Sequence, residues 1–331
     1  MLAMAVKFLI NPISGTSAGP RLWEALRAAC TQLGYVAGED YSLEWTGRGH
    51  TVEQAHRAAA AWDRVVAVGG DGTVRQVAEG LVTAGTGAAL GVIPQGTAND
   101  FSRAVGLYDL WHRRQALGIE QVIEWLMTAP TSPVDVLTAN DQLYFMSYSS
   151  VGFDAQVCRA YARIRHYPPL RAVLRGRLIN ECAYAMLALR HSRLRLPELR
   201  LRLDSAETGW TEEHTRHAMR ALILSNVSSY AGGVQLVEGA CYDDGRFEVT
   251  MIPRLWLFAF LMASRHWPRL RQACQLPSWR VRGASLALAH GWAIQFDGED
   301  YTERLAGDAN AAVHIRVAGQ IPVVCGPQRA H

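Results

Sequence analysis

The strongest constraint on the fold is a repeated alternation of apolar strands and helical patterns in the first third of the chain. Short apolar stretches occupy residues 5–10, 65–68 and 89–93. Between the last two, apolar residues recur at helical spacing from Val74 to Leu81. Repeated units of this kind predict a parallel sheet covered by helices, with ligands bound beyond the carboxyl ends of its strands.

The pattern changes after Pro130 and Pro133, where short alternating strands replace these units. Strands are predicted at 134–137, 143–147, 221–226, 247–252, 285–289, 293–296 and 313–317, and helices within 155–189 and at 255–264. The predicted fold class is α/β, with an N-terminal parallel-sheet domain in residues 1–131 and a C-terminal antiparallel β-rich domain with a helical insertion in residues 132–331. The last residues could return to pack on the first domain.

The basic residues and the cysteines exclude several kinds of site. Lys7 is the only lysine among 33 basic residues, and it lies in the first apolar stretch. Walker-type phosphate loops, protein kinases and pyridoxal enzymes each require a lysine within a recognisable motif. The six cysteines occur singly, so neither a zinc site nor a disulfide framework is predicted.

The chain also lacks the sequence signals of export or membrane insertion. Residues 1–10 have no basic n-region, and the most apolar segment, 256–263, is far shorter than the roughly 20 residues of a membrane span. A cytoplasmic protein is the resulting expectation.

Three glycine-bearing turns follow strands of the predicted sheet. They are Asn11-Pro12-Ile13-Ser14-Gly15, Gly69-Gly70-Asp71-Gly72-Thr73 and Pro94-Gln95-Gly96-Thr97-Ala98-Asn99-Asp100-Phe101. A strand, a glycine turn and a helix start together present backbone N–H groups and a helix dipole that favour an anion such as phosphate. One such turn could be only a tight connection, but three at successive strand ends favour a phosphate site.

Asp71 and Asp100 lie within these turns. A carboxylate beside a polyphosphate is repelled unless a cation or water lies between them, so Mg²⁺ is predicted there. Each aspartate could instead cap the helix that follows it, and both roles could hold together.

Ordered motifs along nearly the whole chain resemble the diacylglycerol kinase catalytic-domain family, soluble lipid kinases that include sphingosine and ceramide kinases. The motifs are Asn11-Pro12-x-Ser14-Gly15, Gly69 to Thr73, Pro94-x-Gly96-Thr97-x-Asn99-Asp100-Phe101-x-Arg103, Gly152-Phe153-Asp154-Ala155, Asn226 with Tyr230 and Gly232-Gly233, Asp244-Gly245, and Asp297-Gly298-Glu299. The motif at 69–73 is shared with NAD kinases, whereas the ordered set is highly specific.

The resemblance implies an ATP-dependent kinase with a nucleotide domain, a β-rich lipid domain and a cleft between them. The glycine turns would hold ATP, and Thr46 and Thr97 match nucleotide-contacting threonines of the family. Asp297 and Glu299 match the acidic pair from which the family's catalytic base is drawn.

The resemblance also implies metal contacts. Asp244, with the backbone carbonyls of Cys241 and Arg246, matches a structural magnesium site of some bacterial members. Gln76 stands where the family usually has a glutamate, so a metal or ribose contact there would be made by a neutral amide. That change could weaken magnesium binding.

From the residues alone, Asp297 and Glu299 have two interpretations. A carboxylate on a glycine turn after an apolar strand could accept the proton of an alcohol that is being phosphorylated. Asp-Gly is also the commonest signal of a surface β-hairpin, in which these acids would only be solvated. The resemblance favours the first interpretation.

Residues 155–203 hold eleven arginines against two acids, with apolar residues interleaved. An amphipathic element of this kind could lie on an anionic bilayer, although a solvated helix pair is the alternative. Trp256, Trp267, Phe258 and Phe260 could line a lipid pocket or the interface, or belong to the core. Nucleic acid is not predicted as a partner, because no motif with base-stacking aromatics accompanies the arginines.

We therefore predict a cytoplasmic lipid kinase, peripherally associated with the inner face of the membrane, that transfers the γ-phosphoryl group of ATP to a lipid hydroxyl with Mg²⁺. Diacylglycerol, giving phosphatidic acid, is the first expectation for the acceptor, and ceramide or a sphingoid base is the second. An NAD kinase-like enzyme and a nucleotide-binding regulator without catalysis are the rival interpretations. The sequence indicates no oligomeric state.

Overall fold

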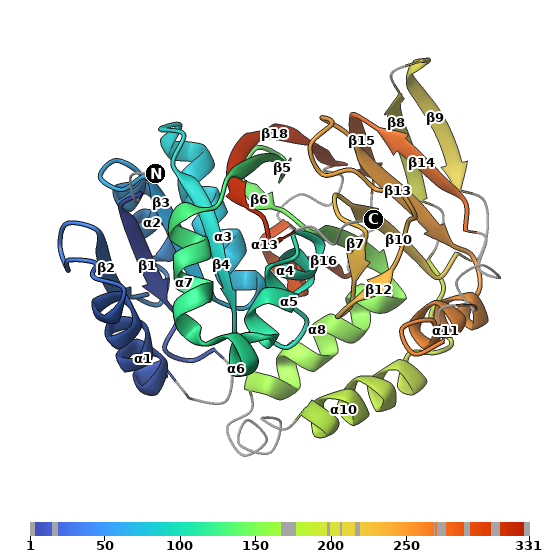
Figure 1. Ribbon diagram of the computed structural model, residues 1–331. Coiled ribbons are helices and arrows are strands. Elements are labelled where there is room, and N and C mark those ends of the chain that lie inside the picture. Colours follow the sequence, from blue (N-terminus) through green and yellow to red (C-terminus); the bar gives the residue numbers. More distant parts are fainter. Residues whose placement is uncertain are drawn as a thin grey trace. The chain divides into compact units, whose positions relative to one another are not determined.

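The computed structural model describes residues 4–14, 19–166, 177–196, 199–205, 207–215, 219–267, 269, 276–287, 292–305 and 312–327. The chain forms two compact units, whose elements are labelled in Figure 1. Unit 1 comprises Met1–Val136 and Gly319–His331, and unit 2 comprises Leu137–Ala318. Strands β5 (Thr131–Ala139) and β18 (Ala312–Val324) each contribute residues to both units.

Unit 1 is built on a parallel sheet, as the apolar stretches predict. Its strands β1 (Val6–Ile10), β2 (Tyr41–Trp45), β3 (Arg64–Gly69) and β4 (Ala89–Pro94) have the order β2-β1-β3-β4. Val323 of β18 pairs in parallel with Leu90 of β4. Every residue of β3 and β4 is buried, which explains why these strands are continuous apolar runs in the sequence.

Helices cover both faces of this sheet. They are α1 (Gly19–Gln32), α2 (Thr51–Ala59), α3 (Asp71–Ala84), α4 (Asp100–Ala104), α5 (Leu107–His112), α6 (Arg114–Leu117) and α7 (Ile119–Thr128). α1 packs on α7 over one face, and α2 packs on α3 over the other (Figure 1). No helix was predicted from the sequence at α5 to α7, although their apolar residues Leu110, Ile123 and Leu126 are buried.

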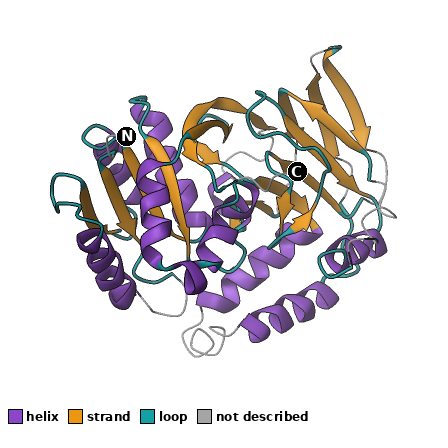
Figure 2. Cartoon of the chain, in the orientation of Figure 1, coloured by secondary structure: helices purple, strands orange, loops and turns teal. Residues whose placement is uncertain are grey.

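Unit 2 is an antiparallel β structure, as predicted, with helices beside its strands (Figure 2). One sheet has the order β14-β13-β10-β7-β16-β17, and a second antiparallel group contains β18, β15, β8 and β9. The bounds are β6 (Leu143–Phe145), β7 (Tyr148–Gly152), β8 (Leu199–Ser205), β9 (Gly209–Thr215), β10 (Ala221–Ser225), β11 (Ser229–Tyr230), β12 (Val234–Gln235), β13 (Phe247–Ile252), β14 (Ser278–Val281), β15 (Gly283–Ala287), β16 (Ile294–Phe296) and β17 (Glu299–Asp300). One core, which includes Leu201, Phe247 and Phe296, joins side chains of both groups.

The helices of unit 2 are α8 (Phe153–His166), α10 (Arg177–Arg190), α11 (Leu255–Ala263) and α13 (Thr302–Leu305). Apolar side chains of α8, α10 and α11 form one cluster. Leu257 and Leu261 of α11 also pack against the six-stranded sheet, in a cluster with Ile223 and Ile252. No helix in the described ranges is long and apolar enough to cross a bilayer.

The arginine-rich segment 155–203 spans two helices and the start of a strand, and the helices lie where helices were predicted within 155–189. The segment contains most of α8, all of α10 and the first residues of β8. On β8, Arg200 and Arg202 are exposed and alternate with buried leucines, which is the period of a strand rather than a helix. Arg159 of α8 faces Asp300 and Glu303 at 3.8 Å and is largely buried.

Arg64 provides a test of how the sheet of unit 1 is tied to α7. Its buried guanidinium donates hydrogen bonds of 2.7 Å to the carbonyl oxygens of Leu126 and Ala129, at the end of that helix. Burial lowers the pKa of Arg64. We expect Arg64→Met to lower the free energy of unfolding by about 2 to 4 kcal/mol, because two buried carbonyls lose charged donors. Urea denaturation measures the change. Arg27→Met on the exposed side of α1 is the control, and an equal loss in both variants would contradict the prediction.

Candidate functional site

The loops at the carboxyl edge of the unit 1 sheet surround the point where the strand order reverses. β1 lies between β2 and β3, so the chain crosses in opposite directions on its two sides. Ile10 pairs with both Trp45 and Val68, and Thr46 N–H donates to the Ile10 carbonyl at 2.9 Å. Asn11 and Thr46 therefore lie at one edge of the sheet with the turn after β3. Ligands of open α/β sheets bind at such a reversal point.

The second and third glycine turns touch through their backbones. A Cβ atom at Gly96 would lie 2.6 Å from Gly70 Cα and 2.8 Å from Asn99 Oδ1, and a Cβ atom at Gly70 would lie 3.0 Å from Gly96 Cα. The two separations at Gly96 are shorter than a Cβ atom tolerates, and the one at Gly70 would require the neighbouring turn to shift. The two glycines thus let neighbouring turns approach more closely than other residues allow.

Asp71 and Asn99 hold these two turns together. Asp71 accepts hydrogen bonds from Asn99 N–H at 2.8 Å and from Phe101 N–H at 3.3 Å, at the start of α4. Asn99, in the left-handed conformation at φ 53°, accepts from Gly96 N–H and donates to the Gly96 carbonyl. Asp71 therefore caps α4, a role that sequence spacing could not indicate.

Most of the other predicted residues of unit 1 lie on the three glycine turns. Asn11 Nδ2 donates to Thr73 Oγ1 at 2.9 Å, which ties the end of β1 to the first turn of α3. Thr97 is exposed at the tip of its turn, whereas Asp100 is buried at the start of α4. Ser14 and the glycines 69, 70, 72 and 96 also belong to these turns, whereas Thr46 follows β2 and Gln76 lies in α3. Gly15 lies outside the described residues.

In unit 2 the turn Asp297-Gly298 joins β16 to β17. Both residues have positive φ, 47° and 79°, and Phe296 pairs with Glu299, so this is a two-residue type I′ hairpin. The hairpin interpretation was therefore correct in geometry. However, Asp297 is only 6% exposed, and its carboxylate accepts hydrogen bonds from the backbone N–H groups of residues 146–148 at 2.9 to 3.1 Å.

Glu299 differs from Asp297 in its accessibility. Its side chain is exposed, and Tyr301 Oη lies 3.3 Å from Glu299 Oε2. Buried groups surround the same hairpin: Cys158 Sγ donates to the Gly298 carbonyl, and burial raises the pKa of Cys158 to about 12. Of the two acids, Glu299 is the one that solvent and a ligand can reach.

Asp154 is a further acid that the sequence analysis quoted in a motif without giving it a role. Tyr230 Oη donates to Asp154 Oδ2 at 2.8 Å, and burial raises the pKa of this carboxyl. The signal was available, because both residues belong to the ordered motifs. Their pairing across 76 positions could not be inferred from spacing.

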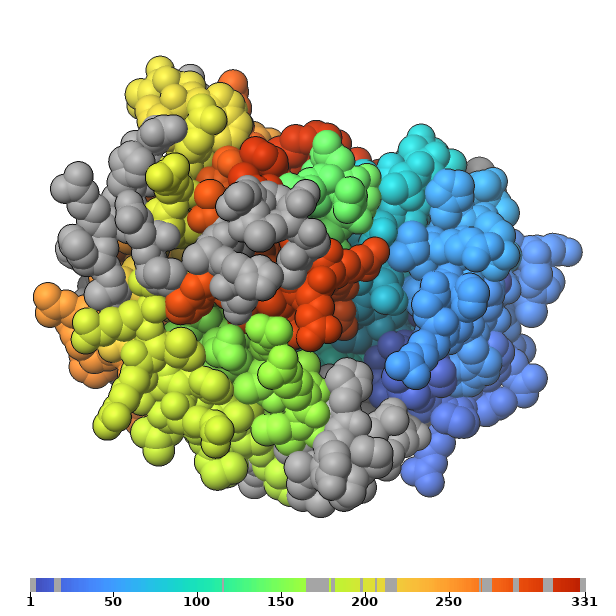
Figure 3. Space-filling view, turned by 180° about the vertical axis from the view of Figure 1, so that it is seen from behind, coloured from blue at the N-terminus to red at the C-terminus, as the bar shows by residue number. Residues whose placement is uncertain are grey.

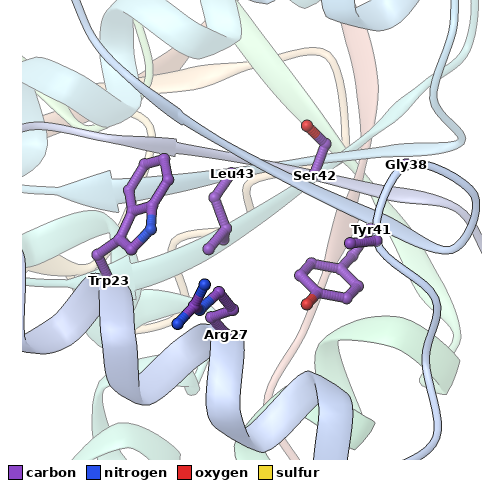
Figure 4. A pocket seen from close by; sticks show the side chains of 7 residues that line it. Trp23, Arg27, Gly38, Tyr41, Ser42 and Leu43 are labelled. Carbon is purple, nitrogen blue, oxygen red and sulfur yellow. The ribbon is translucent and has the colours of Figure 1, made fainter.

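The structure also contains a hollow of about 170 Å³ beside α1, lined by Trp23, Arg27, Ala37, Gly38, Tyr41, Ser42 and Leu43. Figure 4 shows side chains of the helix and of the start of β2 around it. None of the predicted site residues lines this hollow. It lies along the first half of β2, so we assign it no role.

Comparison with known proteins agrees with these motifs. Residues 5–139 match the diacylglycerol kinase catalytic domain, and residues 144–300 match the diacylglycerol kinase accessory domain. A probable lipid kinase YegS-like protein of Pseudomonas syringae pv. syringae is 29% identical over 290 residues, 87% of this chain and 86% of that protein. The chain belongs to the diacylglycerol kinase family of lipid kinases. The predicted resemblance is confirmed, and membership implies the use of ATP.

Other relatives match over different lengths. A probable lipid kinase YegS-like protein of Pseudomonas syringae pv. tomato is 32% identical over 215 residues, so the match spans 65% of this chain and 62% of that relative. The crystal structure of a putative diacylglycerol kinase from Bacillus anthracis covers 99% of both chains with a TM-score of 0.65 and 17% identity. This likeness confirms the predicted fold class.

The carboxylates of Asp71 and Asp100 in unit 1 could hold magnesium only together with a nucleotide. In the part of the chain that the structure describes, no group of three or more His, Cys, Asp or Glu side chains could hold a metal ion. An ion near Asp71 and Asp100 would therefore take its remaining ligands from phosphates and water, which is the usual habit of Mg²⁺.

The predicted metal site at Asp244 contains a competing cation. Arg280 forms an ion pair with Asp244 Oδ2, while Asp244 Oδ1 accepts from Arg246 N–H. Arg280 also pairs across the strands with Glu248, whose pKa burial raises to about 7. Cys241 Sγ donates to Asp243. A magnesium ion at Asp244 stays a prediction, and it would have to displace the guanidinium.

The contact between the two glycine turns leads to a stability prediction. We expect Gly96→Ala to lower the free energy of unfolding by about 1 to 3 kcal/mol and to weaken ATP binding, because the new methyl group forces the turns apart. Thermal denaturation and calorimetric titration with ATP measure the two effects. Gly319→Ala is the matched control, since a Cβ atom there meets only Val82 at 3.7 Å. A Gly96→Ala variant with the wild-type melting temperature would rule out a close backbone contact.

Proposed function

We propose that this chain transfers the γ-phosphoryl group of ATP to the hydroxyl of a membrane lipid. The observation that carries the proposal is the pair of glycine turns at the reversal point of the unit 1 sheet, fastened by Asp71 and Asn99. The match of unit 2 to a diacylglycerol kinase accessory domain favours a lipid acceptor over the soluble nucleotide of an NAD kinase.

Phosphate binding in this proposal rests on backbone N–H groups and Mg²⁺ instead of a lysine. Lys7 forms an ion pair of 2.8 Å with Glu44 and a hydrogen bond with Ser42, within the sheet. The turns of unit 1 would hold the phosphates, with Thr46 and Thr97 as further contacts. Asp71 and Asp100 would hold Mg²⁺ together with phosphates and water, and the ion would supply positive charge against the charge that develops during transfer.

In this proposal the two acids of the unit 2 hairpin, Asp297 and Glu299, have different roles. Glu299 accepts the hydroxyl proton while the hydroxyl oxygen attacks the γ-phosphorus and the bond to the β-phosphate oxygen breaks, releasing ADP. Asp297 holds the hairpin in place through its three backbone N–H donors. Accessibility supports this division, because Glu299 is exposed and Asp297 is buried.

Diacylglycerol is the first candidate for the acceptor, with phosphatidic acid as product, and ceramide or a sphingoid base is the second. A lipid acceptor also requires contact with a membrane, so we propose peripheral association with an anionic bilayer. Arg190 of α10 and Arg193 and Arg195 after it are exposed and support such contact, whereas Arg159 faces Asp300 and Glu303.

The two acids give opposite predictions. Asp297→Asn should lower the free energy of unfolding by about 2 kcal/mol or more, because an amide cannot accept from all three N–H donors. Glu299→Gln should leave stability within about 0.5 kcal/mol of wild type and lower kcat by about 100-fold or more. Thermal denaturation and a kinase assay on the same preparations measure both. Wild-type kcat for Glu299→Gln would assign the proton transfer to Asp297 instead.

The acceptor is tested by incubation with radiolabelled ATP and a panel of lipid alcohols in mixed micelles, followed by separation of the products. We expect labelled phosphatidic acid from diacylglycerol and no label on NAD. The Glu299→Gln variant serves as the inactive control. If only ceramide or a sphingoid base is labelled, that lipid and not diacylglycerol is the acceptor. The absence of any phosphorylated lipid would contradict the proposal of a lipid kinase.

A further inference from the structure

Helix α10 has two apolar faces, and only one of them is covered. Ala183 and Leu187 are buried in the cluster with α8 and α11. Ile179, Met186 and Leu189 lie on another face with Cys182, at spacings of three and four residues, and Met186 and Leu189 are 71% and 77% exposed. Large apolar side chains exposed this far along one face of a helix favour a partner that covers them.

Helix α11 repeats this arrangement. All nine of its residues are apolar, a composition expected of a helix buried on every side. Leu257 and Leu261 are indeed buried, but Trp256 and Phe260 are 50% and 43% exposed and contact each other edge to face. Trp267, after the helix, is 64% exposed.

The two exposed faces belong to one region of unit 2. Leu255 and Phe258 of α11 pack against the cluster that contains Ala183 and Leu187 of α10. Figures 1 and 3 show α10 and α11 next to each other from opposite sides of the molecule. We define the α10–α11 surface by the exposed side chains Ile179, Met186, Leu189, Trp256, Phe260 and Trp267.

Arginines outnumber acids in the segments that carry this surface. Arg190, Arg193, Arg254 and Arg269 are exposed in these segments. Glu181 is the one acidic residue in the sequence of α10, and the sequence contains none from 182 to 197 or from 251 to 275. A symmetric pairing of two copies would bring these arginines together with few carboxylates to pair with them, which disfavours a second copy as the partner.

We infer that the α10–α11 surface inserts into the interface of an anionic bilayer and docks the protein on its lipid substrate. The inference rests on the proposed function for the identity of that substrate. Tryptophan prefers the boundary between headgroups and acyl chains, and arginines at the rim attract acidic headgroups. α11 is nine residues long, so it lies in the interface and does not span the bilayer.

Vesicle flotation without ATP tests the inference. The wild-type chain and the variants Met186→Ser/Leu189→Ser and Trp256→Ser/Phe260→Ser are mixed with vesicles of phosphatidylcholine alone or with about 30% phosphatidylglycerol. We expect wild type to float best with the anionic vesicles. Each double variant should lower the partition constant by about tenfold or more, because two large apolar side chains no longer leave water.

Trp210→Ser is the matched control. Trp210 lies on β9 and is 50% exposed, the same fraction as Trp256. Its replacement should leave flotation unchanged, and circular dichroism checks that every variant is folded. Wild-type flotation of both double variants, or an equal loss for Trp210→Ser, would overturn the inference. A wild-type dimer that the double variants convert to monomers would assign the surface to a second copy instead.

A kinase assay separates this inference from the proposed function. The double variants should phosphorylate a lipid dispersed in detergent micelles at the wild-type rate and a lipid in vesicles about tenfold more slowly. Flotation that depends on the surface in a chain without lipid kinase activity would support the docking surface and contradict the proposed function. Equal loss in micelles and vesicles would contradict docking as the role of these residues.

Discussion

The close approach of Gly70 and Gly96 is the constraint on which the rest of unit 1 depends. The two turns meet with backbone against backbone, and a side chain at Gly96 would overlap Gly70. The Asp71 carboxylate accepts from Asn99 N–H on the neighbouring turn, and the Asn99 side chain bonds to Gly96 within its own turn. The carboxyl edge of the sheet is thereby fixed in position before any ligand binds, so phosphate recognition needs little reorganisation.

A similar device organises the acidic hairpin of unit 2. The Asp297 carboxylate is buried and bound by three consecutive backbone N–H groups, and it fixes a turn whose two residues have positive φ. In both units an aspartate that the sequence predicts to be a metal ligand or a catalytic group, Asp71 or Asp297, accepts backbone hydrogen bonds and stabilises a turn. In the proposed mechanism the proton acceptor at the hairpin is the neighbouring Glu299, because its side chain is exposed.

The arginines show how one residue type serves several purposes once the chain is folded. Arg64 is buried and binds the carbonyls at the end of α7, and Arg280 neutralises Asp244 where a metal was predicted. Arg159 faces the acids beside the hairpin. Other arginines, such as Arg190 and Arg254, are exposed next to the apolar side chains of the α10–α11 surface. In the proposed docking these arginines attract acidic headgroups.

The sequence by itself determined the strands and the turns of unit 1, because apolar runs and helical spacing are local properties that a buried parallel sheet requires. It also determined the family, through motifs whose order survives in the linear chain. Only the tertiary structure decided which groups meet. Asp71 binds residues 28 and 30 positions away, and Asp297 binds residues about 150 positions away. It also decided that the apolar residues of α10 and α11 divide between core and solvent, since burial depends on packing between distant segments and periodicity does not reveal which face is covered.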